Sequence, residues 1–345
     1  MSTRSILGLV YTLEGLRAIG EDPAPVLARH GLDPERLDPA AEIDRGLELR
    51  IYTELAENLR DPLAGLKAGT YFSLAGYGPF TMLLMTCRNA WHAFQTGVHY
   101  RELTYVFSEL ALQPGEGYSA LELRPIPLPP AAYRFRVDGE MSGTYQLAMD
   151  LEKNLNLSMT PRSVEFCYPE PPEKAAYEEH FGCPVHFGSD VCRFWINNDY
   201  LAVPFPTANE TAHEMYRVQC DQLLAQRRES GSDLSEQVRR YLEMFRGDFP
   251  GAEDAARVAG LPERSFRRRL SEEGTSFRTL LEDVRFRKAC EFLEQTDKPV
   301  DELARQLGYS ESAAFIHAFR RWAGMTPAAW RREYKGAQVG PDQAG

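Results

Sequence analysis

Two similar segments lie in the last third of this 345-residue chain, and equivalent positions in them, Pro262 and Ser310, are 48 residues apart. The first covers residues 253–270 (EDAARVAGLPERSFRRRL) and the second covers residues 300–322 (VDELARQLGYSESAAFIHAFRRW). Each has a short apolar helix pattern, a turn of small residues and a second helix pattern. Small side chains at the turn allow the close helix crossing of a helix-turn-helix. The repeat therefore predicts an all-α domain with two helix-turn-helix units.

The second helix of the first unit has one apolar face and one basic face. Phe266 and Leu270 are four residues apart and are predicted to point inward. Pro262 suits a first helical turn. The outward positions then carry the basic side chains Arg264, Arg267 and Arg268, flanked by Arg269.

The second unit repeats this design. Gly308 is expected to end its first helix, and Ser310 to act as the N-cap of the next. Phe315 and Phe319 are predicted to bury one face of that helix. The remaining faces carry Ser312, Ala313, Ile316, His317 and Arg320.

One long helix is predicted between the two units, over residues 277–295. A rigid connector suits two recognition helices that enter successive major grooves, since these are about 34 Å apart along DNA. Thr326 and Pro327 open a terminal helix whose Trp330 is expected to close the core, and residues 336–345 are expected to be disordered.

The charge of the chain is divided unevenly. Residues 232–335 carry 19 Lys and Arg against 18 Asp and Glu, whereas the remaining residues carry 20 against 32, within a net charge of −11. Whole-chain acidity therefore does not exclude nucleic acid, because what matters is whether cations gather on one face. The alternative is that the arginines form only a solvated helix face.

The N-terminal part predicts an α+β domain over residues 1–205. Helix patterns cover the first hundred residues. Short strands are predicted near residues 105–112, 119–125, 132–138, 163–168 and 191–196, with a helix over 141–157. A linker helix and a short joint are expected over 206–233, followed by the DNA-binding domain over 234–335.

The C-terminal segment resembles the DNA-binding domain of AraC/XylS-type transcription regulators over about 100 residues. The resemblance is carried by RSFRRRLSEEGTSFRTLLEDVR, by VDELARQLGYSESAAFIHAFRRWAGMTPAAWR, and by the AC and EFL motifs between them. It implies an activator that binds promoter half-sites as a homodimer and recruits RNA polymerase. Carried over by position, Arg264, Arg267 and Arg268 face the first groove, and Ser312, Ala313, Ile316, His317 and Arg320 face the second. We expect Arg264 and Arg268 to contact base edges, and Arg267, Arg269 and Arg320 to contact phosphates. Pro262 departs from the family pattern, which usually has a capping Ser there.

The N-terminal part is similar to the arabinose-binding-like domain of the ornithine-utilisation-regulator type, through GLDPERL, DPLAGLKAG and LAGYGPFTMLLMTCRNAWHAF. This resemblance implies that the domain binds a small-molecule effector. Aromatic and Met side chains suit an apolar pocket, and arginines suit a carboxylate. The candidate effector residues are Phe72, Tyr77, Phe80, Met82, Met85, Trp91, Arg101, Arg134 and Arg136. A hydrophobic carboxylic acid such as a fatty acid is favoured. The alternatives are a polar amino-acid metabolite, no effector at all, or an aromatic stripe that is simply core.

Other classes of function are disfavoured. The glycine, serine and histidine motifs typical of nucleotide-binding and hydrolytic enzymes are missing, so we expect neither enzymatic activity nor a cofactor. His180, Cys183, His186 and Cys192 lie close in sequence but match no standard metal spacing, so no metal is expected. No apolar segment is long enough to span a membrane, and a cytoplasmic location is expected.

Overall fold

The computed structural model describes residues 3–157, 160–229 and 233–338, and it divides into two compact units, Met1–Ser232 and Asp233–Gly345. No helix among the described residues is both long and apolar enough to cross a lipid bilayer.

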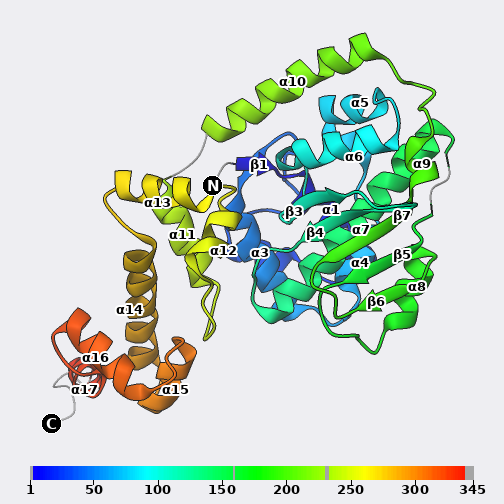
Figure 1. Ribbon diagram of the computed structural model, residues 1–345. Coiled ribbons are helices and arrows are strands. Elements are labelled where there is room, and N and C mark those ends of the chain that lie inside the picture. Colours follow the sequence, from blue (N-terminus) through cyan, green and yellow to red (C-terminus); the bar gives the residue numbers. More distant parts are fainter. Residues whose placement is uncertain (1–2, 158–159, 230–232, 339–345) are drawn as a thin grey trace. The chain divides into compact units, whose positions relative to one another are not determined.

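The N-terminal unit combines helices with a five-stranded sheet (Figure 1). Its α-helices are α1 (Leu7–Ala18), α2 (Ala24–Arg29), α3 (Arg45–Asn58), α4 (Ala64–Gly69), α5 (Pro79–Met85), α6 (Ala90–His99), α7 (Pro130–Leu155), α8 (Lys174–Phe181), α9 (Asn198–Ala202) and α10 (Glu210–Glu229). Two 3₁₀ helices are η1 (Leu74–Tyr77) and η2 (Arg101–Leu103). The strands are β1 (Thr3–Ser5), β2 (Glu42–Asp44), β3 (Glu109–Gln113), β4 (Tyr118–Arg124), β5 (Ser163–Phe166), β6 (Val185–Phe187) and β7 (Cys192–Asn197).

The sheet has the order β3-β4-β7-β5-β6, in which only β5 and β6 pair in parallel. Strand β7 alternates buried and half-buried residues, as a strand with one core face should. Phe194 and Ile196 point into a core that also contains Met141 and Leu151 of α7. The long helix α7 therefore covers one face of the sheet (Figure 1).

Two of the predicted strands are wrong in whole or in part. Residues 132–138 belong to α7, which is buried on nearly every side over residues 135–143. Helix α4 packs so closely on α7 that a Cβ added at Gly65 would lie 2.3 Å from the Phe135 carbonyl oxygen. A helix without a polar face loses its helical periodicity in sequence, which explains the error.

The predicted strand over residues 105–112 begins late, at Glu109. The amides of Phe107 and Ser108 donate to the carboxylate of Glu140 instead of to a neighbouring strand, at 3.0 and 3.1 Å. A buried side chain thus takes the place of strand pairing there. Strand β6, only three residues long, was not predicted.

Helix α10, within the predicted linker segment, packs on the rest of the N-terminal unit. Cys220 and Leu224 are buried against α5 and η2, in a cluster with Leu83 and Leu103. Tyr100 donates from its hydroxyl to Asp221 at 2.6 Å. Part of the predicted flexible joint, residues 230–232, lies outside the described residues.

The C-terminal unit is helical over its described residues, which confirms the predicted fold class. Its helices are α11 (Leu234–Glu243), α12 (Ala252–Val258), α13 (Glu263–Glu272), α14 (Phe277–Gln295), α15 (Val300–Gln306), α16 (Ser312–Ala323) and α17 (Pro327–Gln338). Glu273 accepts from the amides of Leu234 and Ser235 at 3.0 and 2.8 Å, so it satisfies free donors at the start of α11.

Candidate nucleic-acid interface and ligand cavity

Helices α12 and α13 form the first helix-turn-helix. Gly260 takes a left-handed conformation, with φ of +68°, and Leu261 donates from its amide to the Ala256 carbonyl at 3.0 Å. This closes a tight turn after α12. Phe266 and Leu270 are buried, as predicted, and hold α13 against the core of the C-terminal unit.

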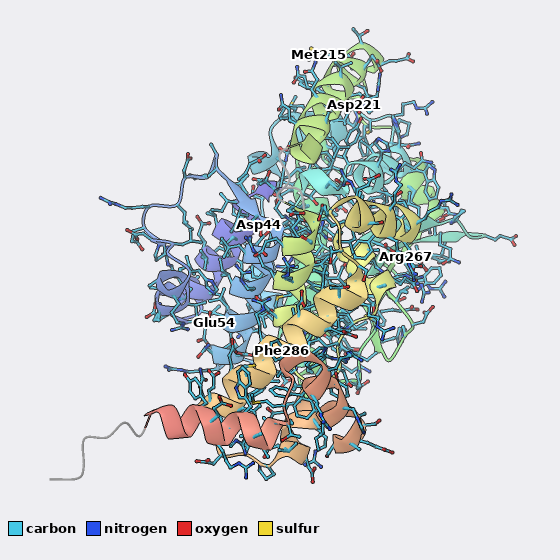
Figure 2. All side chains as sticks on the ribbon, turned by 90° about the vertical axis from the view of Figure 1, so that its left-hand side faces the viewer. Asp44, Glu54, Met215, Asp221, Arg267 and Phe286 are labelled. Carbon is cyan, nitrogen blue, oxygen red and sulfur yellow. The ribbon has the colours of Figure 1, made fainter. Side chains whose placement is uncertain are left out.

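The basic face of α13 is exposed. Arg264 and Arg268 are one helical turn apart and lie opposite the buried Phe266. Arg267 pairs with Glu263 at 2.5 Å, whereas the Arg268–Glu272 contact is longer, at 3.8 Å (Figure 2). Within the described residues, no ion pair is found for Arg264 or for Arg269, which is also exposed. The helix therefore presents four guanidinium groups to solvent.

Helices α15 and α16 form the second helix-turn-helix around Gly308, which has φ of +74°. The predicted N-cap at Ser310 is wrong, because α16 starts one residue later with Glu311 at the cap position and no side-chain cap bond. Phe315 and Phe319 are fully buried, as predicted.

The predicted contact residues of α16 differ in accessibility. Ala313, His317 and Arg320 are exposed and share one face through their spacings of four and three. Ile316 is half-buried, and the half-buried Ser312 donates to Asp301. The first three are thus the accessible part of the predicted set.

Helix α14 connects the two helix-turn-helix motifs of the C-terminal unit. It has the bounds predicted for it, 277–295, which correspond to a length of about 28 Å. Phe286 packs against Phe319, Trp322 and Trp330, with ring centroids 5.7, 5.9 and 6.2 Å apart (Figure 2). Trp330 of the terminal helix therefore closes this core, as predicted. The connector and the second helix-turn-helix share one aromatic cluster.

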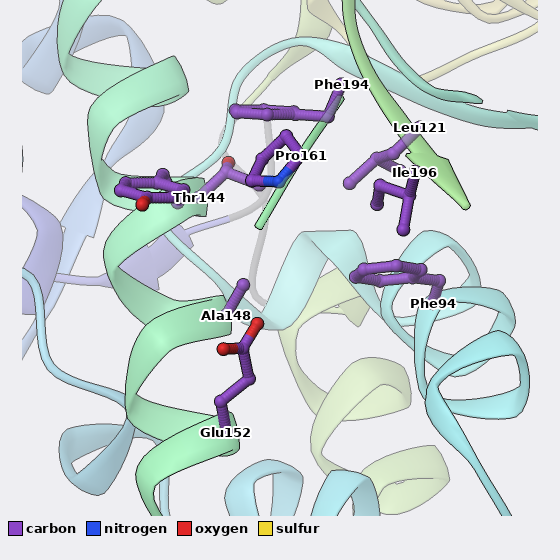
Figure 3. Close-up of a pocket in the computed structure, with 9 residues that line it drawn as sticks. Phe94, Leu121, Thr144, Ala148, Glu152, Pro161, Phe194 and Ile196 are labelled. Atoms are coloured by element: carbon purple, nitrogen blue, oxygen red, sulfur yellow. The ribbon is translucent and has the colours of Figure 1, made fainter. Parts of the chain in front are cut away.

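An apolar cavity of about 90 Å³ lies inside the N-terminal unit, between α6, α7 and β4. A smaller cavity of about 30 Å³ shares four of its lining residues and is bordered by the carboxylate of Glu152 (Figure 3). The shared residues are Phe94, Leu121, Thr144 and Ala148. Because cavities with apolar walls stay dry, this space suits an apolar group.

The structure does not bring the predicted effector residues together in this cavity. Of them, only Phe80 lines it. Phe72 and Tyr77 are core residues, Met82 is 42% exposed, and Met85, Trp91 and Arg101 are half-buried. The residues that do line the cavity come from distant segments, so no local sequence signal marked them.

Two of the predicted carboxylate-binding arginines already have partners. Arg136 is 3% exposed and pairs with Glu140 at 3.0 Å. Arg134 contacts Glu173 at 3.0 Å and Asp138 at 3.7 Å. Burial raises the pKa of Asp138 to about 7, although Tyr168 and Tyr177 donate to its carboxylate. These guanidinium groups stabilise the unit and are not directed at the cavity.

The cysteine and histidine residues considered in the sequence also separate. Among the described residues, His180, Cys183, His186 and Cys192 do not gather into a group with three close ligand atoms. Burial lowers the pKa of His180 to about 4. Cys192 instead lies beside Cys167, with the two sulfur atoms 3.0 Å apart.

Comparison with known proteins finds two family matches in separate stretches of the chain. Residues 20–205 match the family described as the arabinose-binding domain of AraC transcription regulator, and residues 255–333 match a helix-turn-helix domain family. The chain is 33% identical over 273 residues to the ornithine utilization regulator of Pseudomonas aeruginosa, covering 79% of each protein. It is 28% identical to the transcriptional regulator VirS of Mycobacterium tuberculosis, covering 92% of each. The crystal structure of the regulator CdpR from Pseudomonas aeruginosa shares 25% identity and a TM-score of 0.45, over 90% of this chain and 96% of that one.

Proposed function

The chain belongs to the AraC family of transcription regulators, and from that premise we propose that it recognises promoter DNA through α13 and α16. The observation that carries this proposal is the exposed arginine face of α13, held in place by buried Phe266 and Leu270. The second helix-turn-helix presents a comparable helix, α16, beyond the 19-residue connector α14. As the family resemblance implies, the proposal includes binding as a homodimer and recruitment of RNA polymerase.

Individual arginines are assigned different roles. Arg264 and Arg268 point directly away from the core, so they are best placed to reach base edges when α13 enters a major groove. Arg267 and Arg269 flank that line and suit phosphate contacts, which position the protein without distinguishing bases. Arg320 has the equivalent flanking role on α16.

Arg268→Ala is expected to weaken binding to the preferred DNA site by about 5- to 150-fold, because a bidentate arginine–guanine contact contributes about 1–3 kcal/mol. The preferred site is first selected from random duplexes with the full-length protein. Dissociation constants are then measured at one salt concentration for that site and for a scrambled duplex. Binding to the scrambled duplex should change much less.

Arg267→Ala is the matched control on the same helix. This variant should weaken binding to both duplexes by a similar factor. It should also reduce the salt dependence of the affinity, as loss of one phosphate contact does. Equal losses on both duplexes for Arg268→Ala would make that residue a phosphate contact instead. Unchanged binding in both variants would contradict the DNA-binding role of α13.

We further propose that an apolar effector binds in the cavity between α6, α7 and β4. Ligand sites are concave and mostly apolar, and this cavity has both properties. Its volume of about 90 Å³ holds only a few carbon atoms, so a larger ligand requires the side chains to move. With Arg134 and Arg136 engaged elsewhere, the apolar part of the ligand provides the binding energy.

A second candidate effector is a polar amino-acid metabolite. The relative named ornithine utilization regulator supports it. A regulator that binds DNA without an effector is the third possibility. Thermal unfolding distinguishes the three, since a ligand at 100 times its dissociation constant stabilises by about 2.7 kcal/mol.

Ala148→Leu is expected to abolish the stabilisation of the N-terminal unit by the probes 1-octanol and octanoate, because the new side chain occupies the cavity. Thermal unfolding of the full-length variant with each probe measures this. Ala131→Leu, at an exposed position of the same helix, should keep the stabilisation. Stabilisation by L-ornithine alone would favour the polar effector, and none by any probe would favour effector-free DNA binding.

A further inference from the structure

Three potential metal ligands from separate segments meet beside the start of α10. Cys87 follows α5, His92 lies in the first turn of α6, and His213 lies in the first turn of α10. One ligand atom from each residue lies within 4.8 Å of the others. The Cys87 sulfur is 3.9 Å from Nδ1 of His213, and the two imidazole ring centroids are 4.7 Å apart.

The main chain holds these three side chains in place. The Asn89 side chain accepts from the amide of His92 at 2.9 Å, which caps α6. The Arg88 amide lies 3.3 Å from Nδ1 of the same ring, so Nε2 is the nitrogen left for a metal. His213 Nδ1 lies 3.3 Å from the Leu83 carbonyl oxygen, and Cys87 donates to the same oxygen at 3.4 Å. Nδ1 of His213 is also the atom 3.9 Å from the Cys87 sulfur, so it would either exchange this carbonyl for the metal, or keep it as an orienting partner while Nε2 binds the metal.

A second set of contacts brings the start of α10 to this place. Phe205 and Asn209 donate from their amides to the carbonyl oxygens of Arg88 and Thr86, at 2.9 and 3.3 Å. Asn89 and Pro204 also form an isolated β-bridge. The segment before α10 is therefore tied to the segment between α5 and α6 by backbone bonds that do not involve the three ligands.

We propose that Cys87, His92 and His213 bind one Zn²⁺ ion, or a transition-metal ion of similar ligand preference, with a fourth position open to water or another small ligand. Zinc is bound in proteins by thiolates and imidazoles, and one cysteine with two histidines also occurs as the ligand set of copper sites. Tetrahedral bond lengths of about 2.0–2.3 Å place ligand atoms about 3.3–3.6 Å apart, so contraction on the order of 1 Å completes the site.

The surroundings are compatible with such an ion. Cys87 is fully buried and the two histidines are half-buried, so solvent competes weakly for their ligand atoms. The cation nearest to the group in sequence is Arg88, which follows Cys87. Arg88 itself is exposed, so solvent screens its charge.

The consequence of metal binding follows from where the ligands lie. His213 belongs to α10, the last helix of the N-terminal unit, whereas His92 belongs to α6, which lines the apolar cavity. An ion would join these two helices directly. Metal binding would thus stabilise the docking of α10 and couple it to the cavity, a role separate from DNA recognition.

Cobalt and zinc titrations of the metal-free full-length protein test the proposal. We expect one equivalent of Co²⁺ to produce tetrahedral d–d bands and a thiolate-to-cobalt charge-transfer band, and Zn²⁺ to displace it. Cys87→Ser should remove the charge-transfer band. His92→Ala and His213→Ala should each weaken zinc binding by about 10- to 100-fold or more, since even an outer partner of a ligand contributes that much.

Cys183→Ser and His99→Ala are matched controls, because both residues lie in the same unit but outside the group. Both should keep the band and the affinity. Circular dichroism checks folding, and if Cys87→Ser does not fold, the two histidine variants decide. No bound cobalt, a band that persists in Cys87→Ser, or a band lost only in Cys183→Ser would each overturn the proposal.

Discussion

Glu140→Ala is expected to destabilise the N-terminal unit by about 3–5 kcal/mol, because it leaves the buried guanidinium of Arg136 without its ion-pair partner. Both side chains are about 4% exposed and their closest atoms are 3.0 Å apart. The Glu140 carboxylate also accepts from the amides of Phe107 and Ser108 and from the Ser108 hydroxyl. Truncation would therefore leave one charge and several donors unsatisfied inside the core.

The charge cluster around this pair strengthens the expectation. Arg4 pairs with the fully buried Glu48 at 3.2 Å, and its guanidinium lies 4.0 Å from the ring centre of Phe107. Arg136 lies 4.2 Å from the ring centre of Tyr52, whose hydroxyl donates to Glu48 at 2.9 Å. The two ion pairs thus share aromatic neighbours, and loss of one partner is expected to disturb the other.

Scanning calorimetry of the full-length protein checks this prediction, since the two units are expected to unfold in separate transitions. Only the transition of the N-terminal unit should move to lower temperature. Glu170→Ala is the control, because its ion pair with Lys174 is exposed to solvent, which screens the charges, so its loss should shift the transition much less. Equal shifts of the transition in the two variants would show that burial of the Arg136–Glu140 pair does not increase its contribution to stability.

The C-terminal unit could be predicted closely from the sequence because its signals are local. Helix α14 has the predicted bounds, and Phe266, Leu270, Phe315 and Phe319 are all buried. Helical periodicity and turn residues operate over four to seven positions, so they remain visible in a single sequence. The errors lie at helix ends, where boundaries are least defined. The cap at Ser310 is off by one residue, and residues 336–338, predicted to be disordered, belong to α17.

The N-terminal unit was less predictable because its decisive contacts are long-range. The strand predicted over 132–138 is a helix buried from several sides, and periodicity does not mark such a helix. Arg136 was expected to hold a ligand, yet its partner is Glu140, one turn away on the same helix. A guanidinium group needs an acceptor when it is buried, but sequence alone does not say which carboxylate provides it.

The same limit applies to the candidate sites. The cavity draws Phe94, Leu121 and Ala148 from α6, β4 and α7, and the proposed metal ligands Cys87 and His213 are 126 residues apart. Neither set forms a motif in the sequence. By contrast, the basic face of α13 lies on one helix, so it could be identified before the fold was known.

Gly308→Ala is expected to destabilise the C-terminal unit by about 2–5 kcal/mol. It should also weaken specific DNA binding, in proportion to the fraction of molecules in which the second helix-turn-helix is unfolded. Gly308 has φ of +74°, a conformation that costs an L-residue about 1–2 kcal/mol. In addition, its new Cβ would lie 2.4 Å from the Gly247 carbonyl oxygen. The Gly247 amide donates to Gln306 at 2.7 Å, so this backbone has little freedom to withdraw, and the displacement adds about 1–3 kcal/mol.

Gly274→Ala separates the two contributions, because Gly274 has the same φ of +74° but no atom within 4 Å of an added Cβ. It should cost only the conformational part, about 1–2 kcal/mol, measured as the shift of the C-terminal transition in calorimetry. A larger loss for Gly308→Ala than for Gly274→Ala assigns the difference to the contact with Gly247. Equal losses of stability in the two variants would mean that the backbone of residue 247 moves away from the new side chain. The turn before α16 would then tolerate movement at the point where it lies closest to Gly247.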